Sequence, residues 1–341
     1  MNYNKPRCIG TGLLALDIIT NGDIKIKKVL AGGSCGNVLT ILSYLGWDSF
    51  PIARLARNEA TEVLIQDLMK WGVHLDFLIK EDSGSTPIII QRNYKDKKGN
   101  PNHRFEFKCP ESGRFLPRYK PFLTKSIEEF DSSKLVSDFF YFDRVKRSSI
   151  EFAKICKSNG ATIYFEPTSI SDEKLFSESI EIADIIKFSN ERIRNYEKIY
   201  PHFFENKLEI ITLGKWGLKF RYNSDSWVNI PSLTLENIVD SSGSGDWTSA
   251  FFINYLFEKE LKINNSSFVD QKIIKKGLSF SQAMGALNCY FEGARGVMYE
   301  LKDKQTLLTY LTELIQNSLN QIQRVNNYQY LDSQICKLFE T

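Results

Sequence analysis

The sequence has few of the side chains that form structural metal sites. Its 341 residues include only 3 histidines, which lie far apart, and 6 cysteines, none of them in a C-x-x-C pair. A structural zinc site usually takes such ligands in pairs at short spacing, and no motif of that kind is present. Scattered thiols are typical of proteins in a reducing cytoplasm.

Two further absences narrow the class of protein. The sequence contains neither a signal-peptide core at its N-terminus nor an apolar run long enough for a transmembrane helix. The net charge is only +3, so no strong overall field attracts nucleic acid or an anionic membrane. We therefore expect a soluble, cytoplasmic protein that does not bind nucleic acid or a membrane.

Short apolar runs and amphipathic stretches alternate along the chain. The runs at residues 139–142, 162–165 and 210–213 resemble strands buried on both faces. Apolar residues at helical spacing end at Gly46, and Asn58 is a candidate N-cap for a second helix. This alternation predicts a three-layer, Rossmann-like α/β fold with a mainly parallel sheet. Ligands of such sheets bind beyond the carboxyl ends of the strands.

Three segments depart from this rhythm. Residues about 19–33 show period-2 alternation, and residues about 86–108 resemble a hairpin with a polar turn. We expect both to form a small β lid inserted in a single domain. Residues about 316–341 are predicted to form a C-terminal helical extension.

The segment Asp240-Ser-Ser-Gly-Ser-Gly-Asp246 is the most informative part of the sequence about function. A turn of small residues leads into a helix, and the unpaired N–H groups at a helix N-terminus favour an anion such as phosphate. The carboxylate of Asp246 would repel a phosphate, so its position suits a catalytic base for phosphoryl transfer. A capping role for Asp246 in an ordinary glycine-rich turn is the alternative.

The glycines near Gly12 also match a dinucleotide-binding fingerprint. The region that should supply the acidic residue of that fingerprint is rich in lysine, which argues against nicotinamide binding.

The same string resembles the C-terminal signature D-T-x-G-A-G-D of the ribokinase/PfkB family of carbohydrate kinases. The stretch Ala31-Gly-Gly-Ser-Cys-Gly-Asn37, followed by a helix that ends at Leu45-Gly46, is similar to the family's N-terminal signature. The resemblance covers roughly residues 7 to 315. It implies a ribokinase-like fold and transfer of the γ-phosphoryl group of ATP to a hydroxyl, most simply of a sugar.

The resemblance also implies roles for individual residues. The catalytic group would be Asp246 with the N–H groups of Gly243, Ser244 and Gly245. Substrate hydroxyls would contact Asp17, Gly32, Gly33 and Asn37. ATP would lie along Lys187, Ser189, Thr212, Gly214, Gly217 and Asn288, with Asn288 in the adenine pocket. Asp240 and Glu191 are candidate metal-binding residues. Glu191 is the candidate for organising Mg²⁺, and a monovalent cation such as K⁺ is expected near Asp240 and the loop at Gly293.

Some positions depart from the family pattern. Arg192 stands where a magnesium-organising glutamate is usual, and Glu166 stands where aspartate is frequent. Arg192 leaves open a non-catalytic sugar or nucleotide sensor, and a nucleoside kinase or sugar-phosphate kinase of the same fold is a further alternative. A homodimer through the lid is a further expectation of the resemblance.

The segment Cys109-Pro-Glu-Ser-Gly113 is similar to half of a zinc knuckle. The second cysteine of such a knuckle is missing from the neighbouring sequence. The sequence therefore predicts a loop thiol at Cys109 and not a metal ligand.

Overall fold

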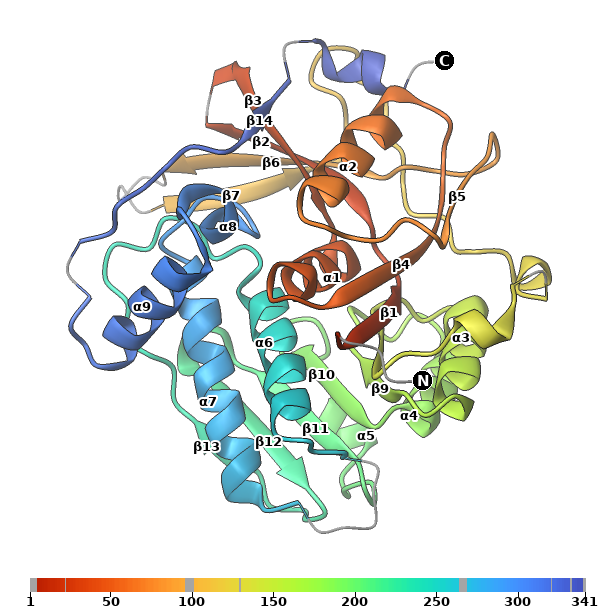
Figure 1. The fold of residues 1–341 in the computed structure, drawn as a ribbon, viewed down its shortest axis with the longest axis vertical. Coiled ribbons are helices and arrows are strands. Elements are labelled where there is room, and N and C mark those ends of the chain that lie inside the picture. The colour runs from red at the N-terminus through yellow and green to blue at the C-terminus, as the bar shows by residue number, and fades with distance from the viewer. Residues whose placement is uncertain are drawn as a thin grey trace.

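A computed structural model describes residues 5–21, 23–95, 101–128, 130–263, 269–319, 321–331 and 333–339. Within them the main sheet has nine strands in the order β13-β12-β11-β10-β9-β8-β1-β4-β5 (Figure 1). The strands from β11 to β5 pair in parallel, and β12 and β13 add an antiparallel edge. The main-sheet strands are β1 (Arg7–Thr11), β4 (Asp48–Leu55), β5 (Leu78–Lys80), β8 (Phe139–Phe142), β9 (Thr162–Phe165), β10 (Ile185–Ser189), β11 (Leu208–Thr212), β12 (Leu218–Tyr222) and β13 (Val228–Ile230).

Helices cover both faces of this sheet. The α-helices of the described residues, on this sheet and elsewhere, are α1 (Ser34–Tyr44), α2 (Glu59–Lys70), α3 (Arg147–Ser158), α4 (Glu173–Ile182), α5 (Tyr196–Ile199), α6 (Ser244–Glu258), α7 (Gln271–Asn288), α8 (Gly296–Glu300) and α9 (Lys304–Ile315). The same residues also form the short 3₁₀ helices η1 (Thr124–Ser126), η2 (Ser132–Lys134), η3 (Gly214–Trp216) and η4 (Ile335–Leu338). The Asn58 side chain accepts a hydrogen bond from the Thr61 N–H, so the predicted N-cap of α2 is confirmed.

Strand alternation divides the core between the two faces. In β8, Phe139 and Tyr141 pack with α1, α6 and α7, whereas Phe140 and Phe142 pack with α3 and α4. The predicted three-layer α/β fold is therefore confirmed. Among the described residues, every helix is too short or too polar to span a lipid bilayer.

A second sheet lies above the first (Figure 1). Its order is β14-β3-β2-β6-β7, formed by β2 (Ala15–Asn21), β3 (Asp23–Gly32), β6 (Ile88–Lys95), β7 (Pro101–Glu106) and β14 (Gln329–Tyr330). Both segments expected to form a lid contribute strands to it. Residues 96–100, in the polar turn of the predicted hairpin, lie outside the described residues. Helix α2 packs against β2 and β3 and buries the apolar face of this sheet.

The prediction of a helical C-terminal extension is wrong. Helix α9 ends at Ile315, and the described residues between it and β14 form neither helix nor strand. Strand β14 then pairs with β3. Beyond it, η4 buries Ile335 and Leu338 in the apolar cluster beneath the second sheet. The polar composition of this tail suggested a helix, but the tail instead pairs with β3 through β14 and buries the apolar side chains of η4.

Candidate active site

Glycine is required at the turn before α6. Gly243 is the N-cap of α6 with φ +73°, and a Cβ atom there would lie 2.0 Å from the Ala294 carbonyl oxygen. A larger residue would therefore be strained and would clash with backbone. Gly245 lies inside the first helical turn, where a Cβ would meet Lys187 Nζ at 3.6 Å. This part of the turn is open toward other polar groups of the site.

Asp246 lies in the first turn of α6 and points toward α1. Its Oδ2 accepts a hydrogen bond of 2.7 Å from Asn37 Nδ2. Burial, followed by the nearby charge of Glu166, raises the pKa of Asp246 to about 7, although Asn37, Lys187 and Arg192 act in the opposite direction. A carboxylate with a pKa near neutrality is suited to take up a proton during a reaction.

A buried lysine and a glutamate flank this carboxylate. The Lys187 Nζ lies 2.5 Å from Glu166 Oε1 and donates to the Gly245 carbonyl oxygen at 3.1 Å. Tyr141 donates to the other oxygen of Glu166 at 3.2 Å, and Ser249 also donates to it. In the sequence, Glu166 stands out only as a departure from the family pattern. The structure places it beside the Asp246 carboxylate, where it holds the ammonium group of Lys187.

Asn37 is oriented by a buried cation. Its Oδ1 accepts a hydrogen bond of 3.2 Å from Arg295 Nε, which leaves Nδ2 to face Asp246. Arg295 Nη2 lies 2.9 Å from Asp67 Oδ2, and Tyr299 donates to the same carboxylate. Both Arg295 and Asp67 are buried. Neither was predicted from the sequence, and only the charge of an arginine within the glycine-rich stretch 293–296 could have drawn attention to it.

Asp17 lies at the second sheet and faces the same network. Its Oδ1 is buried and has no hydrogen-bond partner among the residues that the structure describes. Burial raises the pKa of Asp17 to about 7, with Arg295 acting in the opposite direction. A Cβ on Gly32 would lie 1.9 Å from Asp17 Oδ2, and Gly33 has φ +78°. The glycine pair therefore leaves room for the carboxylate, whose free oxygen can accept a hydrogen bond from a ligand.

Asp240 connects the turn before α6 with the second sheet. Its carboxylate accepts bonds from the N–H groups of Ser242 and Gly293, each at 2.9 Å, and from the Gln91 amide. His103 Nδ1 lies 3.3 Å from Asp240 Oδ1. Burial alone would raise the pKa of Asp240, but these hydrogen bonds outweigh it and lower the pKa. Four hydrogen-bond donors surround this carboxylate, and metal binding by Asp240 stays a prediction.

The residues predicted along ATP lie at the ends of neighbouring strands. Ser189 ends β10 and pairs in register with Thr212 at the end of β11. The turn that follows needs glycine, because Gly214 has φ +57° and Gly217 has φ +99°. A Cβ on Gly217 would also lie 2.1 Å from the Ile230 carbonyl oxygen.

Asn288 is held by hydrogen bonds to the backbone of neighbouring segments. Its side chain is fully buried, and Nδ2 donates to the Ser242 carbonyl oxygen at 3.0 Å and to that of Gly293 at 3.3 Å. Its Oδ1 accepts a bond from the Val297 N–H at 3.3 Å. That Asn288 lines an adenine pocket stays a prediction. The side chain joins the turn before α6 to the loop at Gly293.

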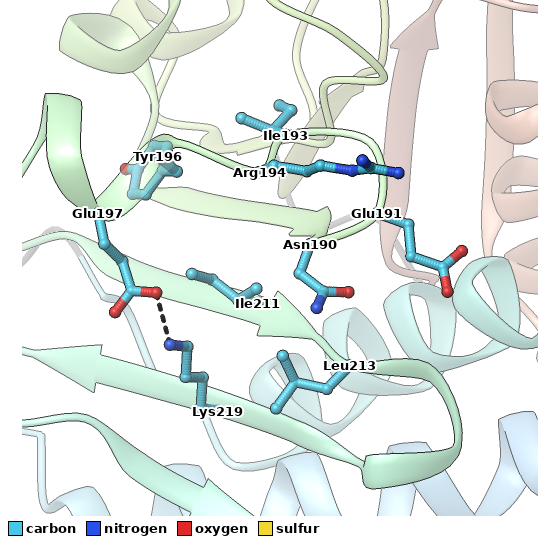
Figure 2. A pocket seen from close by; sticks show the side chains of 9 residues that line it. All are labelled: Asn190, Glu191, Ile193, Arg194, Tyr196, Glu197, Ile211, Leu213 and Lys219. Carbon is cyan, nitrogen blue, oxygen red and sulfur yellow. Dashed lines mark hydrogen bonds and ion pairs between the residues drawn. The ribbon is translucent and has the colours of Figure 1, made fainter.

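A pocket of about 300 Å³ opens beside the end of β10 (Figure 2). It is lined by side chains of the β10–α5 loop, of α5, and of β11 and β12 with the residue that follows β11. The ion pair between Lys219 and Glu197, two of the lining residues, spans 2.6 Å. Its Ile211 belongs to the apolar cluster on the face opposite α6. Among the predicted site residues only Glu191 lines this pocket, so it is distinct from the cluster around Asp246.

The curated proteins that this chain resembles in sequence are named as kinases of sugars. No protein-family model matches the chain. An uncharacterised sugar kinase of Pyrococcus horikoshii is 25% identical over 268 residues, which cover 75% of this chain and 84% of the relative. Fructokinase-2 of Oryza sativa subsp. japonica is 24% identical over 286 residues, which cover 77% of this chain and 80% of the relative.

Solved structures share the fold over nearly the whole chain. The fructokinase of Xylella fastidiosa with bound ATP has a TM-score of 0.66 and 15% identity, covering 93% of this chain and 100% of its own. The Pyrococcus horikoshii sugar kinase has a TM-score of 0.65 and 21% identity, with 92% and 100% covered. The resemblance to the ribokinase/PfkB family is thus confirmed: the chain has the ribokinase-like fold, and the sequence relatives are named as a sugar kinase and a fructokinase.

Proposed function

We propose that this protein is an ATP-dependent sugar kinase in which Asp246 is the catalytic base. The observation that carries the proposal is the position of Asp246 in the first turn of α6, hydrogen-bonded to Asn37 and with a pKa raised to about 7. The sugar kinases among the sequence relatives support the reaction class. In this reaction a substrate hydroxyl gives its proton to Asp246 while its oxygen attacks the γ-phosphorus of ATP.

The turn before α6 is suited to bind the transferred group. The N–H groups of the first helical turn lack intrahelical partners, and Gly243 and Gly245 add no side chain that would block a phosphate. The Ser244 N–H donates to the Ser241 carbonyl oxygen only at 3.4 Å, which is long for a hydrogen bond. These donors would stabilise the charge that develops on the phosphoryl oxygens.

The substrate hydroxyls would lie between the two sheets. Asp17 offers a buried carboxylate oxygen that accepts no hydrogen bond from the described part of the chain, and Asn37 is held in one orientation by Arg295. ATP would approach from the ends of β10 and β11, where Ser189, Thr212 and the turn at Gly214 and Gly217 lie side by side. The second sheet would then act as a lid over the sugar.

Magnesium would be held by the phosphates of ATP and by Glu191. This carboxylate is exposed at the end of β10, whereas that of Asp240 is surrounded by donors. When bound, Mg²⁺ would neutralise charge on the phosphate oxygens. A potassium ion near Asp240 and the loop at Gly293 stays a prediction, and it would have to rely on carbonyl oxygens.

A homodimer through the second sheet would use its β7 edge, because β14 covers the edge of β3. Phe105 and Phe107 support this choice, since they are 49% and 52% exposed at that edge. Size-exclusion chromatography with light scattering would test this proposal by comparing the molar mass of Phe105→Lys with that of the wild type.

We also propose a cytoplasmic location, supported by six cysteines of which none forms a disulfide.

The experiment that tests the function is a substrate panel. The purified chain is incubated with ATP, Mg²⁺ and single hexoses, pentoses, sugar phosphates or nucleosides, and phosphorylated products are detected by mass spectrometry. The proposal predicts a phosphate ester of at least one free sugar. A product only from nucleosides or sugar phosphates would identify another acceptor class, and no product from the whole panel, despite binding in a thermal-shift assay, would indicate a sensor.

A further inference from the structure

The C-terminal tail brings a second cysteine to the incomplete knuckle of the 109–113 segment. After β14 pairs with β3, the tail turns into η4, which contains Cys336. The backbone N–H of Cys336 donates to Glu111 Oε2 at 3.2 Å. The cysteine that is missing from the neighbouring sequence is therefore supplied from more than two hundred residues away.

The 109–113 segment forms a closed, tight turn. The Gly113 N–H donates to the Cys109 carbonyl oxygen at 2.8 Å, and the Cys109 N–H donates to that of Arg114 at 2.8 Å. Gly113 has φ +72°, which favours glycine. Cys109 itself is buried. The turn therefore holds the Cys109 thiol in place without the help of a ligand.

Three potential ligand atoms gather at this point. The sulfur atoms of Cys109 and Cys336 and a carboxylate oxygen of Glu111 lie within 4.8 Å of one another. Cys109 Sγ is 3.9 Å from Glu111 Oε2. In a tetrahedral zinc site the ligand atoms lie roughly 3.5–3.8 Å apart, given zinc–ligand bonds of about 2.0–2.3 Å. Small side-chain movements would bring the three atoms to these separations.

The surrounding charge suits a divalent cation bound by two thiolates and a carboxylate. Such a set carries three negative charges, so zinc would leave one uncompensated. Lys27 Nζ lies 3.6 Å from Glu111 Oε1 and donates to the Ser333 carbonyl oxygen at 3.1 Å. This largely buried ammonium group would balance the remaining charge and also contacts the tail.

We propose that Cys109, Glu111 and Cys336 bind one zinc ion, with water as the fourth ligand, and that this ion fastens the C-terminal tail to the second sheet. Thiolate sulfur favours zinc over the harder magnesium and calcium ions. The site uses none of the residues around Asp246, so it is independent of phosphoryl transfer. Its role would be to stabilise the second sheet through β14 and η4.

The test measures zinc in the full-length chain. Protein purified with a non-chelating reductant is stripped of metal, titrated with Zn²⁺ against a competing chelator, and analysed by inductively coupled plasma mass spectrometry. We expect about one zinc ion per chain, and a loss of at least about tenfold in affinity for Cys336→Ser and Glu111→Gln. Zinc should also raise the melting temperature of the wild-type chain but not that of Cys336→Ser.

A matched control is Cys289→Ser. Cys289 is a buried thiol that donates to the Gly285 carbonyl oxygen, a bond that serine can also make, and this variant should bind zinc as the wild type does. Cys336 is preferred to the buried Cys109 for the main variant, because a change in the tail leaves the core intact. With Co²⁺ in place of zinc, the wild type should show a thiolate-to-metal absorption band that Cys336→Ser lacks.

Three results would overturn the proposal. The first is no stoichiometric binding of Zn²⁺ to the reduced, wild-type chain. The second is equal affinity in the wild type and Cys336→Ser. The third is a disulfide between Cys109 and Cys336 in protein isolated under thiol-blocking conditions, because oxidised sulfur cannot bind the ion.

Discussion

The substitution Asp246→Asn should stabilise the fold at neutral pH. The pKa of Asp246 is raised from 3.8 to about 7, first by burial and then by the charge of Glu166. Between these two pH values the folded chain keeps a proton that the unfolded chain has released, so the free energy of unfolding falls as pH rises. A difference of about 3 pH units corresponds to roughly 4 kcal/mol at most.

Asparagine removes this cost because it is neutral and of the same size. Its Oδ1 can still accept the hydrogen bond from Asn37, although the attraction of Lys187 is lost. We therefore expect Asp246→Asn to be more stable than the wild type by roughly 1–4 kcal/mol at about pH 8. At about pH 4 the carboxyl group is protonated in the folded chain, and the gain should shrink to less than about 1 kcal/mol.

Urea denaturation of both chains at these two pH values measures the effect. Circular dichroism reports unfolding, and equal m-values establish that the same surface is exposed. Ser279→Ala, in an exposed part of α7, serves as a control that should leave the pH dependence unchanged. Equal stabilities of Asp246→Asn and the wild type at about pH 8 would refute the reasoning, since Asp246 would then be ionised in the folded state at no cost.

Three further predictions concern the same site. Asn37→Ala removes a donor that lowers the pKa of Asp246, so the acidic limb of the kcat/KM pH profile should move up by about 1–2 units; an unmoved limb would contradict the role of Asn37. Gly243→Ala should destabilise the chain by at least roughly 2 kcal/mol in thermal or urea unfolding, because of the positive φ and the clash with Ala294, whereas Gly245→Ala should cost less than about 1 kcal/mol; similar losses would count against this difference. Lys187→Met leaves Glu166 without its cation and should cost about 3–5 kcal/mol in unfolding experiments, with part of the loss restored in the double variant with Glu166→Gln; a double variant no better than the single one would rule out the ion pair as the cause.

The layers of the fold were predictable because they depend on local patterns. The buried strands at 139–142 and 162–165 and the cap at Asn58 follow from short apolar runs and one side chain that accepts a backbone hydrogen bond. The C-terminal tail was not predictable in this way. Its course depends on pairing with β3 and on the burial of Ile335 and Leu338, contacts that join distant parts of the chain.

The candidate site was predictable where a residue sits in a glycine-rich motif. Asp246, Asn37 and Gly243 lie in such motifs, and the structure brings Asp246 and Asn37 into contact. Residues that act through pairs were missed, because neither Arg295 nor Asp67 has a signature until the fold places them 2.9 Å apart. The positions of Asn288 and Asp240 in the sequence could not reveal that both side chains form hydrogen bonds with neighbouring groups of the chain.

The most direct test of the account is the turnover number of Asp246→Asn with the sugar that the panel identifies. Both chains are compared at saturating ATP and sugar, at about pH 8, where the wild-type carboxylate is ionised. The account predicts that kcat falls by roughly 10²–10⁴, the usual scale for loss of a general base, while the variant remains folded and binds ATP. A kcat within about twofold of the wild type would contradict the assignment of Asp246 as the catalytic base.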